Sequence, residues 1–114
     1  MTIKIVTNKI SRKELQKLAE EIFGDMVKAT ADIERGVMAI GGELHIDSNE
    51  LLLKAGSKQT DVWGFNLYPR EKGDGFIEYN SLINIKPAFG NRSPDIQDET
   101  IKKKIAEIVL RFVE

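Results

Sequence analysis

The amino-acid sequence predicts an α+β fold, a two-layer sandwich in which one mainly antiparallel sheet carries two long helices on one face. Two observations lead to this fold class. Apolar residues repeat at helical spacing near the N-terminus and at the C-terminal end, whereas between these stretches they alternate with polar residues, as in half-buried strands. The alternating segments are joined by short loops, which favours antiparallel neighbours because parallel strands need long crossovers.

The central segment 61–87 is predicted to form a hairpin of two long strands around which the chain is organised. Alternation in the first strand places the side chains at 63, 65 and 67 on one face. The intervening PREKGDG contains a proline and two glycines, which interrupt strand pairing and permit a reversal. Residues 82–86 are expected to form the returning strand. The expected core combines this hairpin with both long helices and consists of Trp63, Phe65, Leu67, Ile83, Ile85, Leu15, Leu18, Ile22, Ile105 and Val109.

Both long helices have recognisable starts. Ser11, followed three residues later by Glu14, forms a capping box, and Gly24 provides a stop for this first helix. Asp98 is expected to cap the last helix, whose apolar residues recur every three or four positions.

Shorter elements lie between them. The expected strands are residues 3–6, 26–34 and 37–40, with an extension at 43–46. Asp47 or Ser48 is expected to cap a short helix that ends before Gly56. A chain of 114 residues is too short for two cores, so we expect one domain over residues 1–114.

The composition argues against several classes of function. The 17 basic and 18 acidic residues give a formal net charge of −1, so no general field attracts nucleic acid or an anionic membrane. The absence of cysteine excludes disulfides, thiolate zinc sites and thiol nucleophiles. No apolar run approaches the ~20 residues of a membrane span, and the N-terminal segment lacks a signal-peptide pattern. We therefore expect a cytoplasmic protein that binds neither nucleic acid nor membrane.

Glu43, His45 and Asp47 form the first candidate site. In an extended strand alternate residues face the same way, so two carboxylates and the only imidazole of the chain would share one face. Such a row suits acid–base chemistry or the approach of a metal ion. The competing interpretation is structural, because a capping Asp47 already accepts bonds from backbone N–H groups. A transition-metal site needs three or four converging ligands, so we expect no metal and no cofactor.

The sheet face opposite Trp63 is the second candidate site. Its expected polar residues are Asn66, Tyr68, Asn84 and Lys86, with Glu78 nearby. If both long helices cover the other face, this face is open to a small polar ligand or a partner; the competing interpretation is the solvated side of a half-buried sheet. Val62 and Leu82 on the same face indicate that a second subunit, a loop or a ligand covers it.

The third candidate is the loop Asn91-Arg92-Ser93, where backbone N–H groups, a guanidinium and a hydroxyl would suit an anion. Pro94 removes one donor and no phosphate-loop spacing is present, so an ordinary structural loop is the competing interpretation.

Three stretches, GGELHID at 41–47, GSKQTDVWGFNLYP at 56–69 and SLINIKPAFGNRS at 81–93, resemble those of a family of small, uncharacterised prokaryotic proteins. The resemblance implies a self-contained small domain and supplies no catalytic residues. The residues themselves leave two hypotheses: a non-catalytic ligand- or protein-binding module that self-associates, or a small metal-dependent or acid–base enzyme built on Glu43, His45 and Asp47.

Overall fold

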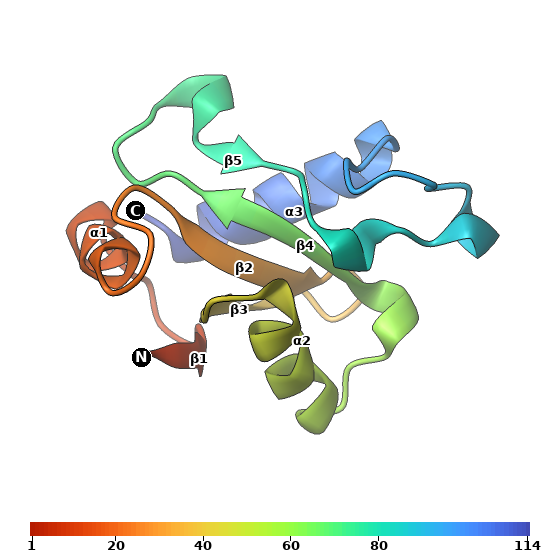
Figure 1. Ribbon diagram of the computed structural model, residues 1–114, viewed down its shortest axis with the longest axis horizontal. Helices are drawn as coiled ribbons and strands as arrows, with labels where there is room; N and C mark the ends of the chain where they lie inside the picture. The colour runs from red at the N-terminus through yellow and green to blue at the C-terminus, as the bar shows by residue number, and fades with distance from the viewer.

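A five-stranded antiparallel sheet lies at the centre of the computed structural model, which describes residues 1–114 (Figure 1). The strands follow the spatial order β1 (Ile3–Ile5), β3 (Val37–Gly41), β2 (Val27–Asp32), β4 (Val62–Leu67) and β5 (Ile77–Glu78). Every neighbouring pair in the sheet is antiparallel. The α+β class and the antiparallel sheet are therefore confirmed.

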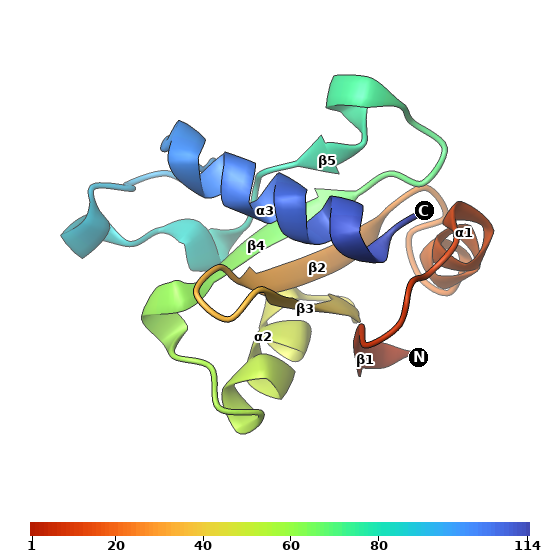
Figure 2. The same ribbon diagram turned by 180° about the vertical axis from the view of Figure 1, so that it is seen from behind.

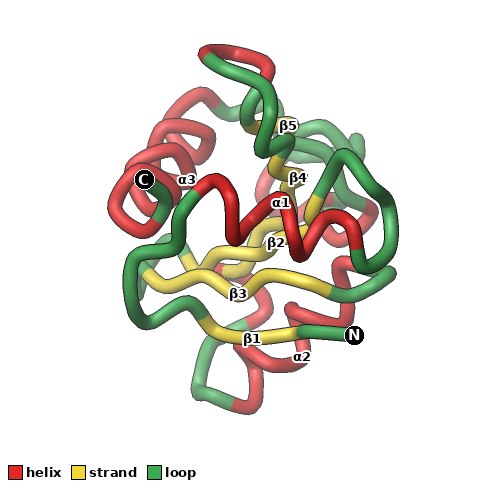
Figure 3. Tube along the Cα trace, turned by 90° about the vertical axis from the view of Figure 1, so that its left-hand side faces the viewer, coloured by secondary structure: helices red, strands yellow, loops and turns green.

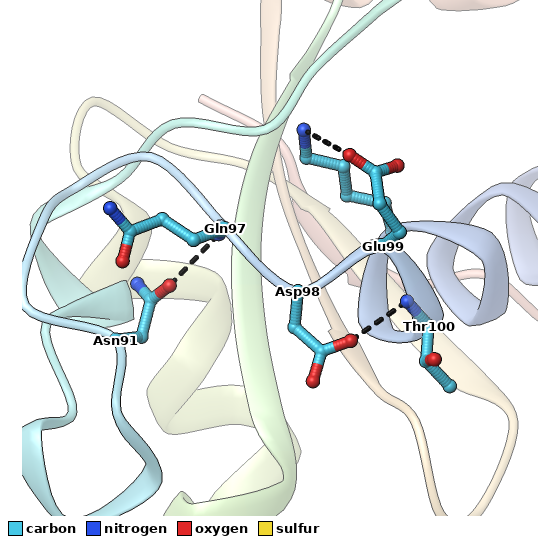
Figure 4. Close-up of polar contacts among 6 residues, drawn as sticks. Asn91, Gln97, Asp98, Glu99 and Thr100 are labelled. Atoms are coloured by element: carbon cyan, nitrogen blue, oxygen red, sulfur yellow. Dashed lines mark hydrogen bonds and ion pairs between the residues drawn. The ribbon is translucent and has the colours of Figure 1, made fainter.

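Two of the three α-helices begin where the sequence predicts. The helix α1 (Arg12–Glu20) begins after Ser11, whose hydroxyl accepts a hydrogen bond from the Glu14 backbone N–H at 3.0 Å. The helix α3 (Glu99–Phe112) begins after Asp98, whose carboxylate accepts from the Thr100 backbone N–H at 2.8 Å (Figure 4). Each cap satisfies a backbone donor that the first helical turn leaves unpaired.

The larger apolar core lies between the sheet and these two helices. Both α1 and α3 contribute to one cluster with the alternate residues of the strands, which include Ala29, Ala31, Trp63, Phe65, Leu67, Leu15, Ala19, Ile105, Ile108 and Val109. Six of the ten core residues expected from the sequence are fully buried in this cluster, and Leu18 packs against its edge. The remaining three expected core residues, Ile22, Ile83 and Ile85, do not belong to this cluster.

The opposite face of the sheet is covered by the third helix, α2 (His45–Lys54). Figure 3 shows α1 and α3 on one side of the sheet and α2 on the other. In Figure 1 α2 lies in front of the sheet and α3 behind it, and in Figure 2, seen from behind, α3 lies in front. Leu52 of α2 packs with Ala39 and Val62 in a second, smaller cluster. The predicted two-layer arrangement is thus not confirmed, because a helix of the chain itself lies on the face expected to be open.

Residues 82–86 do not form the predicted returning strand, and this prediction is wrong. The strand β5 contains only Ile77–Glu78, and Leu82–Asn84 form a 3₁₀ turn. The reason is the side-chain amide of Asn84, which donates to the Gly64 carbonyl at 2.8 Å and accepts from the Gly64 N–H at 2.7 Å. One side chain thereby makes the hydrogen bonds to β4 that a neighbouring strand was expected to make. Leu82 and Ile85 point outward.

Gly64 permits this close approach. A β-carbon at position 64 would lie 2.6 Å from the side chain of Ser81, a distance that real β-carbons do not tolerate. The segment that begins at Ser81 can therefore cross directly over β4.

The predicted extension at 43–46 is also wrong, because α2 begins at least three residues earlier than expected. His45 and Ile46 lie in the first helical turn, and Leu44 is the N-cap residue. Asp47 caps from inside the helix: its carboxylate accepts from the Leu44 backbone N–H at 3.1 Å. The chain reaches this turn through Gly42 at φ +94°, where a β-carbon would lie 2.7 Å from the Asp47 side chain.

Replacing Trp63 by alanine is expected to lower the free energy of unfolding by about 3–5 kcal/mol, because the indole is the largest fully buried side chain of the core. Urea denaturation followed by circular dichroism measures the change. The matched control Leu110→Ala removes a side chain that is 69% exposed and is expected to change stability by less than about 0.5 kcal/mol. Equal effects of the two substitutions would contradict the core assignment.

Replacing Asn84 by alanine is expected to leave both backbone groups of Gly64 without a partner, at a cost of about 1–3 kcal/mol for each group. Urea denaturation again gives the value, and Asn8→Ala, at an exposed position, is the control. If Asn84→Ala were as stable as the control, the amide would not be what pairs this edge of β4.

Candidate interaction surface

Glu43, His45 and Asp47 do not converge. Glu43 is exposed, the carboxylate of Asp47 caps α2, and the His45 side chain is buried against the sheet. The structure contains no group of three or more histidine, cysteine, aspartate or glutamate side chains arranged to hold a metal ion. The geometric basis of the enzyme hypothesis, a row of three groups on one strand face, is therefore absent because His45 lies on a helix.

His45 has a structural contact with the sheet. Its Nε2 donates to the backbone carbonyl of Phe65 at 2.9 Å, across the gap between α2 and β4. Burial lowers the pKa of His45, and the bond to the Phe65 carbonyl opposes this shift only in part. The imidazole is consequently held in its neutral form, and it anchors the first turn of α2 to the sheet.

Asn66, Tyr68 and Glu78 form a polar cluster beside His45. One carboxylate oxygen of Glu78 accepts from the Asn66 amide at 2.8 Å and from the Tyr68 hydroxyl at 3.0 Å. Burial and the neighbouring Glu78 raise the pKa of Tyr68. These contacts join β4 to β5, where Asn66 and Glu78 are register partners. The side-chain oxygen of Asn66 is buried without a hydrogen-bond partner.

Asn84 and Asn91 are buried and bonded to the backbone. The Asn91 amide donates to the carbonyls of Asn84, Ser93 and Asp95 at 2.8, 2.9 and 3.1 Å, and its oxygen accepts from the Gln97 N–H at 2.9 Å (Figure 4). Both amides therefore organise the segment between β5 and α3. Arg92 is exposed beside them.

Lys86 is the one candidate residue that borders a hollow. Its ammonium donates to the Gln59 carbonyl at 2.9 Å and lies 5.2 Å from the centre of the Trp63 ring. Burial lowers the pKa of Lys86, although nearby Asp61 opposes the shift. No carboxylate lies within ion-pair distance of this ammonium.

The hollow itself, which we call the α2 groove, has a volume of about 360 Å³ between α2 and the segment 82–89. Its apolar residues are Ile46, Leu82, Ile83, Ile85 and Phe89, and its polar residues are Asn49, Gln59, Thr60 and Lys86. The groove holds one cation and no carboxylate, and the side-chain amides of Asn49 and Gln59 bond each other reciprocally at 2.9 Å. It is suited to holding apolar side chains of another molecule.

Of the groove residues, sequence reasoning selected only Lys86 as a site candidate. The sequence places Leu82 on the face opposite Trp63 and assigns Ile83 and Ile85 to the core, and it indicates neither Ile46 nor Phe89 as a site residue. Their common signal is a large apolar residue within or next to a turn or helix start, where no periodic pattern buries it.

Comparison with known proteins identifies a family and no function. Residues 4–112 match the model of a family described as "Protein of unknown function (DUF5674)". The chain belongs to this family, since the match covers nearly all of it. No curated protein and no solved structure matches. No helix of the structure is long and apolar enough to cross a membrane.

Acidification is expected to destabilise the fold through His45. The unfolded state takes up a proton at the ordinary pKa of about 6.5, whereas burial lowers the pKa in the folded state, so stability falls as the pH drops below about 6.5. Urea midpoints measured between about pH 7.5 and 5, above the range in which carboxylates titrate, should show this loss. His45→Gln should flatten the profile, and an unchanged slope in this variant would contradict the assignment.

Proposed function

We propose that this domain is a non-catalytic protein-interaction module that self-associates, with the α2 grooves of two copies facing each other. The observation that carries the proposal is the gathering of large exposed apolar side chains around one hollow. Leu82 is 77% exposed, Phe89 59%, Ile46 48% and Ile85 43%. Single exposed apolar residues are ordinary on protein surfaces, but a group of them with a polar rim is typical of an interaction site.

The shape of the α2 groove supports a second copy as the occupant. The same surface contains protruding side chains, chiefly Leu82 and Phe89, and the hollow that they border. A two-fold interface requires each surface to supply both the knob and the hole, because the same patch is used on both copies.

The charge of the groove supports the same occupant. The polar residues of the lining are amides and a hydroxyl, which can donate hydrogen bonds to a second copy and accept them from it. The lining has no carboxylate that a dimer would bury without a partner. The single cation, Lys86, is already held by a backbone carbonyl and an indole ring. With a net charge of −1, two chains also repel each other little at long range.

The size of the apolar surface predicts a reversible dimer. Four partly exposed large side chains provide on the order of 300–500 Å² of apolar surface per copy, less than the ~800 Å² per partner of a standard stable interface. We therefore expect dissociation in the micromolar range or weaker, so that the state of the chain follows its concentration.

The proposal is tested by sedimentation velocity of the purified chain from about 1 to 500 μM. The expected result is a shift from monomer to dimer, which Leu82→Asp abolishes by placing a carboxylate in the apolar contact. The matched control is Leu110→Asp on α3, because Leu110 is comparably exposed but lies outside the α2 groove. A wild-type chain that stays monomeric, or a Leu82→Asp variant that dimerises as the control does, would overturn the proposal.

A further inference from the structure

We propose that a cleft between α3 and the segment 73–79 is a binding site for a small organic anion, a carboxylate or phosphate carried on an apolar body. This site is distinct from the α2 groove, with which it shares no lining residue. Residues of α3 and of the segment 73–79 line the cleft. Figure 2 shows the course of α3 and of β5.

The cleft is large enough for a ligand and has apolar residues on both of its sides. Its volume of about 610 Å³ lies in the range of small-molecule sites, roughly 300–1,000 Å³. Phe76, Ile77 and Tyr79 contribute from the strand side, and Ala106 and Leu110 contribute from α3.

Arg12 provides a preorganised anion partner in the cleft. Its guanidinium stacks on the Phe76 ring with the central carbon 3.6 Å from the ring centre. Nη1 donates to the carbonyls of Pro69 at 3.1 Å and Glu71 at 2.9 Å, which fixes the plane of the group.

The rest of this guanidinium is free. Nη1 carries two hydrogens and both are used, so Nε and Nη2 remain, and together they form the side fork that pairs with two oxygens of a carboxylate or phosphate. No carboxylate of the chain lies within ion-pair distance of Arg12. A fixed arginine with an unused fork, in the lining of a cleft that also has apolar residues, is an arrangement that recognises an oxyanion on an apolar body.

The other charged residues of the cleft are two cations, Lys102 and Lys103, and two anions, Asp74 and Glu99, so the net positive charge of the lining is that of Arg12. The Lys102 ammonium lies 3.5 Å from the Glu99 carboxylate, so these two charges offset each other. Lys103 has no such partner and adds to the attraction of an anion, while Asp74 opposes it. Burial and the carboxylates of Glu99 and Asp74 raise the pKa of Tyr79, so its phenol stays a neutral hydrogen-bond donor beside the ligand.

The test is a titration of ¹⁵N-labelled protein with octanoate, followed by amide chemical shifts, with octanol as the uncharged counterpart. Octanoate is expected to move the amides of residues 73–79 and of the α3 face, and octanol to bind at least about tenfold more weakly. Arg12→Gln is expected to weaken octanoate binding at least about tenfold, whereas the control Arg70→Gln, at an exposed position outside the cleft, leaves it unchanged.

Two further variants keep the test decisive if Arg12→Gln unfolds. Ala106→Phe fills the cleft from α3 while retaining Arg12, and is expected to abolish the shifts. Asp74→Asn removes the opposing charge and is expected to strengthen binding. Absence of shifts at millimolar octanoate, equal binding of octanol, or unchanged binding by Ala106→Phe would each overturn the proposal. These outcomes are independent of self-association, because Arg12, Asp74 and Ala106 all lie outside the α2 groove.

Discussion

The pairing of the Asn84 side chain with the backbone of Gly64 is the interaction on which the rest of the structure depends. All six residues of β4 are buried, so both edges of this strand must find hydrogen-bond partners inside the protein. β2 pairs one edge along its whole length, whereas β5 pairs only two residues of the other. The amide of Asn84 supplies the missing partner where β5 has ended.

This pairing also explains why apolar side chains face solvent. A returning strand would have alternated and turned Ile83 and Ile85 toward the core. Because a single side chain does the pairing, the backbone around it is free to turn, and the amide of Asn91 holds that turn through the carbonyl of Asn84. Leu82 and Ile85 are thereby carried outward, next to Ile46 of α2. The exposed surface that we propose for self-association is a consequence of how the buried amides close the sheet.

The sequence predicts those parts of the fold that depend on local or periodic signals. The capped starts of α1 and α3 were predictable because Ser11 and Asp98 bond backbone groups within three residues, and Trp63, Phe65 and Leu67 were predictable because strand alternation assigns a face. The 3₁₀ turn at residue 82 was not, because it depends on a contact twenty residues away. The start of α2 was missed because Asp47 caps from the third helical position, a pattern that reads equally well as an N-cap.

The same distinction between local and long-range signals applies to the sites. Glu43, His45 and Asp47 look like a site only while they are assumed to lie on a strand; helical geometry separates them and turns His45 into an anchor to Phe65. Arg12 carries no local signal, since it is an ordinary first-turn residue of α1 until Phe76 and two carbonyls from a loop more than fifty residues later fix its guanidinium. Sequence spacing therefore suggested a site where none assembles and gave no sign of the arginine that tertiary contacts prepare, because chemistry at a surface depends on which elements meet there.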